Sequence, residues 1–80
     1  MDAQVARHVI RACLRSTGEL QRLLELLKEQ CPPDEYQTFA KAIGMALASI
    51  HIEIVNRVTS LHPELEGEME TTISRYGRYL

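Results

Sequence analysis

Cys13 and His51 are the first pair of residues whose types and positions could do chemistry. If Pro32 and Pro33 close a helical hairpin, positions 13 and 51 lie at about the same level along it. A cysteine beside a histidine can form a thiolate nucleophile or half of a metal site. No third group is placed to orient the histidine, and a cysteine on an apolar helix face usually packs as a small hydrophobe. We therefore predict that this pair is not catalytic.

Metal-ligand spacing is the second chemical pattern. His51-Ile52-Glu53 contains the H-x-E fragment of zinc deaminases, but the sequence lacks the P-C-x-x-C segment that completes such a site. Ligands on a helix need pairs at i, i+3 or i, i+4, and no two cysteines or histidines have that spacing. The sequence predicts no metal site and no cofactor.

Arg57 and His62 form an R-x4-H pair near the end of a predicted helix, a spacing also found in small helical RNases of toxin–antitoxin systems. So short a pattern arises easily by chance. The acidic run that follows His62 would repel RNA, and the chain is short for the bundle of those enzymes. A small helical RNase using Arg57 and His62 is kept as the enzyme alternative, and the main prediction is that the protein is not an enzyme.

Four arginines share one side of the first predicted helix: Arg7, Arg11, Arg15 and Arg22. This side is the best candidate for a surface that contacts anions, such as phosphates, nucleic acid or an acidic protein. No aromatic residue lies among the arginines, so stacking on single-stranded bases is not supported. The ordinary interpretation is a solvated helix face, and nucleic-acid binding through it is a less favoured alternative.

Three helices must position these residues, at about 2–30, 34–60 and 63–77. Proline restricts the residue before it and is tolerated in a first helical turn, so Pro32-Pro33 and His62-Pro63 separate the helices. The apolar phase of the first helix continues across Gly18, which favours one continuous helix over two hinged ones. The tight junction at Pro32-Pro33 makes the first two helices antiparallel neighbours.

The second helix has apolar residues on two sides. Its main apolar stripe consists of Tyr36, Phe39, Ala40, Ile43, Leu47, Ile50, Ile54, Val58 and Leu61. A second side carries small and apolar residues, and we expect a close-packing or dimer face there: Gly44, Met45, Ala48, Ile52 and Val55. Because the short third helix cannot cover both sides, a second copy of the chain is expected to do so.

Composition fits one globular domain, residues 1–80. The chain has a formal net charge of −2 and is 45% hydrophobic. Two cysteines about 27 Å apart along one helix cannot pair, and with no signal-peptide pattern they indicate a reducing, cytoplasmic compartment. Ala42–Ile50, the most apolar stretch, is too short for a membrane span of about 20 residues.

The sequence therefore predicts an all-α fold, a long antiparallel hairpin plus a shorter third helix, assembled as a dimeric bundle. The expected function is a non-enzymatic protein-interaction or regulatory module of the adaptor, chaperone, antitoxin or immunity type. The expected partners are a second copy of the chain and another protein, with no membrane.

Overall fold

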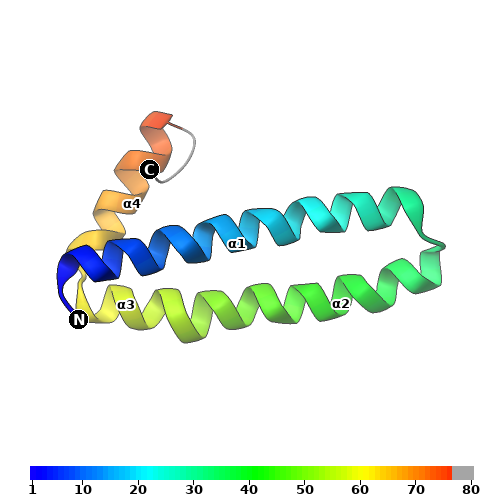
Figure 1. Cartoon of the computed structure of the whole chain (residues 1–80), viewed down its shortest axis with the longest axis horizontal. Coiled ribbons are helices and arrows are strands. Elements are labelled where there is room, and N and C mark those ends of the chain that lie inside the picture. The colour runs from blue at the N-terminus through cyan, green and yellow to red at the C-terminus, as the bar shows by residue number, and fades with distance from the viewer. Residues whose placement is uncertain (77–80) are drawn as a thin grey trace.

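The computed structural model describes residues 1–76, apart from the side chains of residues 72 and 74–76. The described part is all-α. It contains α1 (Ala3–Gln30), α2 (Pro33–Ser49), a π-helical turn η1 (Ile50–Val55), α3 (Asn56–Leu61) and α4 (Glu64–Tyr76). α2, η1 and α3 follow one another without a break, so the chain forms three helical bodies (Figure 1). The predicted end of the last helix at residue 77 lies outside the described residues.

The helix boundaries follow from local chemistry. Asp2 is the N-cap of α1, and its side chain accepts a hydrogen bond from the Val5 backbone N–H at 2.8 Å. Pro33 occupies the first turn of α2, where its missing N–H leaves no bond unmade. Asp34 and Glu35 follow in that turn, next to the positive end of the helix dipole. α1 begins at Ala3 and α2 at Pro33, each one residue from the expected start.

α1 is continuous through Gly18, as the uninterrupted apolar phase predicted. It runs antiparallel to the long helix formed by α2, η1 and α3, and contacts all three segments (Figure 1). The hairpin and the shorter α4 confirm the predicted all-α architecture within one chain.

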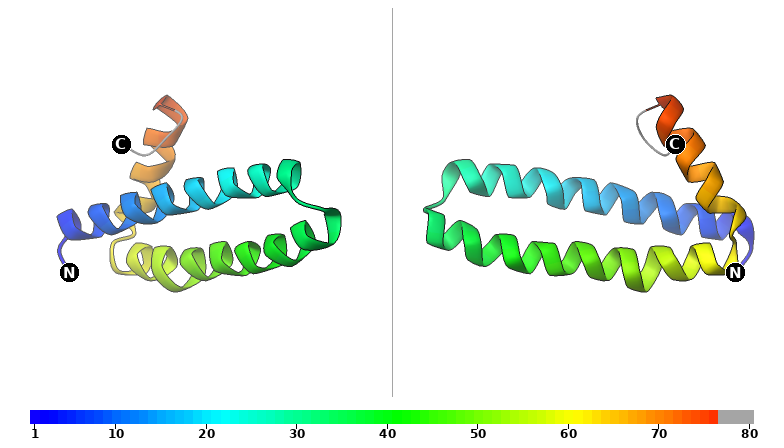
Figure 2. Two further views of the ribbon diagram at one scale, coloured as in Figure 1. Left: turned by 45° about the vertical axis from the view of Figure 1, so that its right-hand side comes forward. Right: turned by 180° about the vertical axis from the view of Figure 1, so that it is seen from behind.

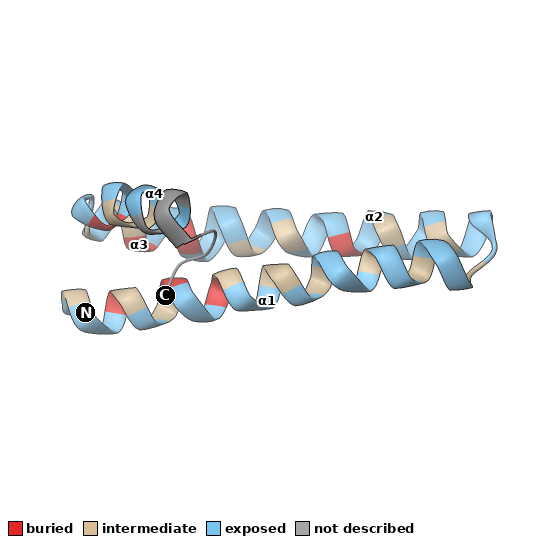
Figure 3. Cartoon of the chain, turned by 90° about the horizontal axis from the view of Figure 1, so that it is seen from above, coloured by how far each residue is buried: buried red, intermediate tan, exposed pale blue. Residues whose placement is uncertain are grey.

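The core lies at the end of the hairpin where α1 begins and α3 passes into α4. Ala6, Ile10, Val58 and Leu65 form one buried cluster, and Ile10 and Leu65 are its largest fully buried side chains. Leu65 belongs to α4, so the core depends on a residue contributed after the elbow at 62–63. Towards the turn, buried positions become rare (Figure 3).

The molecule is long and thin. Its principal extents are 44 × 25 × 15 Å, and the two long helices lie side by side in every view (Figures 1 and 2). α4 packs on α1 only at the elbow end, so among the described residues each long helix is covered towards the turn by the other long helix alone.

The π-helical turn changes which residues face α1. Its bonds connect residue i to i+5: the Asn56 N–H donates to the His51 carbonyl oxygen. The turn therefore adds one residue, about 100° of rotation, to the phase of the helix. Val55 consequently faces inward and is buried, which corrects its expected place on the outer close-packing face.

The same rotation corrects part of the predicted main stripe. Ile54 and Leu61, expected in the core, are 39% and 65% exposed. Phe39 lies before the π turn and is also 48% exposed, because it sits at the flank of the inward face rather than at its centre. Leu47, at the middle of the stripe, is half-buried.

Candidate functional site

Cys13 and His51 lie in different environments. Cys13 is buried among the apolar residues of α1, and burial raises the pKa of its thiol. His51 is exposed on the surface of η1. A raised pKa keeps the cysteine in its thiol form, which is the opposite of what a nucleophile requires.

Cys31 forms the C-cap of α1 and is a free thiol, as is Cys13. Its pKa is raised by desolvation first, and then by the charge and the hydrogen bond of Glu35. The two cysteines are therefore unpaired, as predicted from their separation along α1.

Among the described residues, no three His, Cys, Asp or Glu side chains gather closely enough to hold a metal ion. The two residues of the R-x4-H pattern are each engaged elsewhere. Arg57 donates to Glu53, one turn earlier, at 3.0 Å. His62 faces Glu64 with one ring nitrogen and the Met1 backbone with the other.

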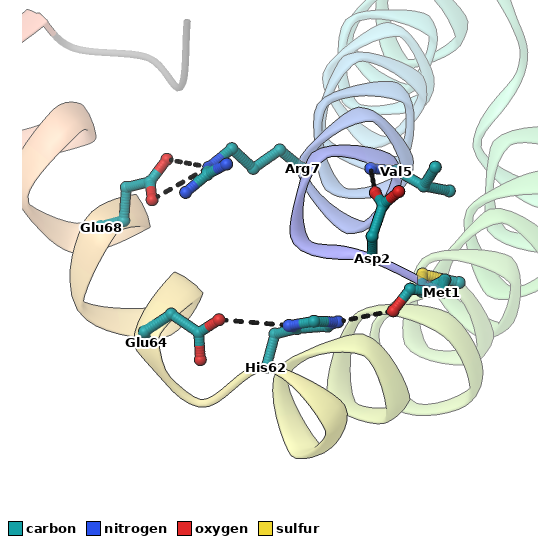
Figure 4. Close-up of polar contacts among 7 residues, drawn as sticks. All are labelled: Met1, Asp2, Val5, Arg7, His62, Glu64 and Glu68. Atoms are coloured by element: carbon teal, nitrogen blue, oxygen red, sulfur yellow. Dashed lines mark hydrogen bonds and ion pairs between the residues drawn. The ribbon is translucent and has the colours of Figure 1, made fainter.

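His62 ties three parts of the chain together at the elbow between α3 and α4 (Figure 4). Its Nδ1 lies 3.1 Å from Glu64 Oε1, and its Nε2 lies 3.0 Å from the Met1 carbonyl oxygen. The pKa of Glu64 is lowered, mainly by a hydrogen bond from its own backbone N–H at the start of α4 and then by the bond to His62. These contacts fix where α4 leaves the hairpin, which sequence spacing did not predict.

A second polar contact joins α4 to α1 (Figure 4). The Nε of Arg7 donates to both carboxylate oxygens of Glu68, at 2.9 and 3.1 Å. Arg22 pairs with Glu19 one turn away, and Arg11 also has an interaction partner. Arg15 is exposed. Much of the positive charge on the predicted arginine surface is thus offset by nearby carboxylates.

The predicted close-packing side of α2 is bare within the chain. Gly44, Met45, Ala48 and Ile52 are all exposed. A Cβ added at Gly44 would meet no atom within 4 Å, so none of the described helices rests there. The expected close approach is therefore not made inside the monomer, and Val55 does not belong to this side.

A shallow hollow lies at the outer side of η1 and α3. Its volume is about 410 Å³, and it is lined by Ile52, Asn56, Arg57, Ser60 and Leu61. It is open to solvent, whereas small-molecule sites usually enclose most of their ligand.

Uncovered apolar side chains are the dominant surface feature. Ten large hydrophobic residues are exposed among those the structure describes: Met1, Val5, Leu23, Leu26, Phe39, Met45, Ile52, Ile54, Leu61 and Ile73. Scattered single residues of this kind are normal, but large contiguous apolar patches mark interaction surfaces.

The long second helix is also apolar enough to be compared with a membrane span. Pro33–Leu61 has 29 residues, a mean hydropathy of 1.4 over its most apolar 18-residue window, and only 11% of that window buried. The expectation of no span considered Ala42–Ile50 alone, whereas the structure joins that stretch to apolar residues on both sides. By length and composition the helix could cross a bilayer, a property it shares with core helices of soluble proteins.

No protein-family model, no curated protein and no solved structure matches this chain.

Proposed function

We propose that this protein is a non-enzymatic helical interaction or regulatory module that works as a homodimer. The observation that carries the proposal is the contrast between a small core and a large apolar surface. Of the residues that the structure describes, seven hydrophobic ones are buried, while ten large ones are exposed. Exposed apolar surface of this extent is stabilised when another apolar surface covers it.

The accessible surface of the chain supports a dimer. A compact monomer of 9.1 kDa exposes about 4,900 Å² by the usual scaling with mass, whereas this chain exposes 5865 Å². By the same scaling, two chains packed into one compact body would bury about 3,600 Å² between them. That area falls in the range of about 2,000–5,000 Å² typical of obligate homodimers.

The radius of gyration agrees with the surface area. A compact domain of 80 residues has a radius of gyration of about 12 Å, and one of 160 residues about 15 Å. The chain has a radius of gyration of 14.8 Å. The radius of gyration of one chain is thus close to that of a compact protein of twice its length, as expected for one half of a dimer.

A non-catalytic role is supported by where the candidate chemical groups lie. Cys13 is buried and His51 is exposed, while Arg57 and His62 are engaged with other partners. Nucleic-acid binding is less favoured because Arg7 and Arg22 already pair with carboxylates. We propose a cytoplasmic location, supported by two free thiols.

Light scattering coupled to gel filtration, at about 1–100 µM protein, tests the proposal directly, because dimerisation depends on concentration. We expect a mass of twice the 9.1 kDa chain and a melting temperature that rises with concentration. A monomer with a concentration-independent melt would contradict it. Binding to heparin or duplex DNA that weakens steeply with salt would instead favour the nucleic-acid alternative.

A further inference from the structure

We infer that the second copy packs on one particular face of the hairpin, the face opposite α4, and completes an antiparallel four-helix bundle. We call this the open face and define it by Val5 and Leu23 of α1, Phe39 of α2 and Ile54 of η1. The inference rests on the proposed homodimer and adds which surface forms it. It differs from the side of Gly44, Met45, Ala48 and Ile52 that the sequence indicated.

The four residues share one position relative to the contact between the long helices. Each comes directly before a residue that faces the other helix. Val5 precedes buried Ala6, and Ile54 precedes buried Val55. Likewise Leu23 and Phe39 precede residues 24 and 40, which are partly buried. One residue back is a rotation of about 100° in a fixed sense, so each exposed side chain lies on the same flank of its own helix.

These flanks lie on the same face of the hairpin. Two antiparallel helices are related by a two-fold axis perpendicular to the plane that contains them. That axis exchanges the helices but keeps each face of the pair on its own side. An equal rotation from the contact line, in the same sense, therefore leads to the same face in both helices. The exposed fractions on this face are 48% for Val5, 40% for Leu23, 48% for Phe39 and 39% for Ile54.

The opposite face has different chemistry. It consists of residues that directly follow inward-facing ones. Apart from Leu14, which packs against the core cluster, these are polar or small, among them Arg7, Arg11, Gly44, Ala48 and Asn56. The ion pair between Arg7 and Glu68 shows that α4 lies on this side. α4 therefore cannot cover the open face, and its own anchoring contacts keep it away from there (Figure 4).

A second copy of this chain fits the open face best. On α1 the flank from Val5 to Leu23 passes through Val9, Ala12 and Ser16, and its one charged residue, Glu19, already pairs with Arg22. On the second helix the same flank carries charge only at its ends, at Glu35 and Arg57. Arg57 pairs with Glu53 of its own helix, so the face offers little to a phosphate or to an acidic peptide, and its apolar side chains require an apolar surface of similar length. The same face of a second hairpin has that length and chemistry, and stacking two layers builds the usual four-helix arrangement.

Two matched variants test the inference. Phe39→Glu puts a charge on the open face, and Met45→Glu puts the same charge on another side of the same helix, at a residue that is 67% exposed. We expect Phe39→Glu to weaken dimerisation by about 100-fold or more, because the carboxylate would be buried without a partner. Met45→Glu should change the dimer dissociation constant by less than about threefold. Helical circular dichroism reports whether each chain stays folded.

A second measurement keeps the test decisive if Phe39→Glu fails to fold. Cysteines introduced as Phe39→Cys and Met45→Cys, with Cys31 replaced by serine, are labelled with a maleimide above and below the dissociation constant. Labelling at position 39 should slow at least about tenfold in the dimer, and labelling at 45 should not.

The outcomes separate the two proposals. A dimer that is broken by Met45→Glu, or protected at 45 rather than 39, would overturn the open face while leaving the homodimer intact. A native chain that stays monomeric would overturn the proposed function itself. A chain that floats with vesicles of phosphatidylcholine and phosphatidylglycerol, and is protected at 39 only when lipid is present, would make a bilayer the occupant and overturn the inference.

Discussion

Leu65→Ala is the substitution that most directly tests how the core is built. Leu65 is fully buried and packs into the cluster of Ala6, Ile10 and Val58, although it belongs to α4. Removing a buried leucine side chain costs about 2–5 kcal/mol, from the lost transfer free energy and the cavity that remains. α4 is attached through a short elbow and can partly collapse onto the gap, so we expect about 2–4 kcal/mol.

A loss of about 2–4 kcal/mol, as estimated above, is a large share of the total free energy of unfolding. A domain of 80 residues has a free energy of unfolding of about 4–12 kcal/mol, so the variant should be close to the limit of stability. Urea titration at a fixed protein concentration measures the change, because dimerisation would otherwise shift the midpoint. Hydrogen exchange of the amides in α4 distinguishes global unfolding from detachment of that helix alone.

Leu61→Ala is the matched control. Leu61 is the same residue type four positions earlier, but it is 65% exposed at the end of α3. We expect its loss to change the free energy of unfolding by no more than about 0.5 kcal/mol. Equal effects of the two substitutions, or an effect of Leu65→Ala below about 1 kcal/mol, would refute the assignment of the core to the elbow end of the hairpin.

Arg7→Gln should cost up to about 1 kcal/mol, because the pair with Glu68 is partly exposed, and the cost should shrink in about 1 M salt in thermal melts. Glu64 has a lowered pKa, so its contribution to stability is present above pH 4.5 and is lost as the pH falls through its folded value; Glu64→Gln should flatten that part of the stability–pH curve. Gly44→Ala should increase the free energy of unfolding by about 0.4–1 kcal/mol, and so raise the melting temperature, because the added methyl meets no atom. A lower melting temperature would reveal a close neighbour from another chain.

The helix boundaries could be predicted because they depend on local chemistry. Proline at 32–33 and at 63 restricts its predecessor whatever the rest of the chain does, and the structure ends α1 at Gln30 and α3 at Leu61. The continuous phase across Gly18 was equally reliable, since a break would have shifted the apolar positions.

The placement of α4 could not be predicted in the same way. Arg7 and Glu68 are 61 positions apart, and His62 reaches the Met1 carbonyl across the same separation. No sequence spacing predicts either contact, because both depend on the angle between α3 and α4 at the elbow. The charges could be seen in the sequence, but their pairing could not.

Periodicity also failed to identify what covers an apolar residue. The stripe of α2 included Phe39 and Ile54 together with Ile43, and only Ile43 of these is buried. A helical apolar pattern indicates that one face of the helix is buried against an apolar partner. It does not distinguish a helix of the same chain from a helix of a second copy. For Phe39 and Ile54 the structure excludes burial within the described chain, which is why they now define the open face.

The π turn can be tested by two single-residue deletions, for which it predicts opposite effects on stability. Since η1 holds one residue more than an α-helical turn, deleting exposed His51 should restore ordinary i to i+4 bonding while Ile50 and Val55 keep facing α1. Deleting exposed Ala42 from the regular part of α2 instead rotates everything on one side of it by about 100°. We expect the His51 deletion to melt within a few degrees of the parent chain and the Ala42 deletion to unfold or melt far lower. If both deletions are equally damaging, η1 is not an inserted residue, and the inward position of Val55 needs another cause.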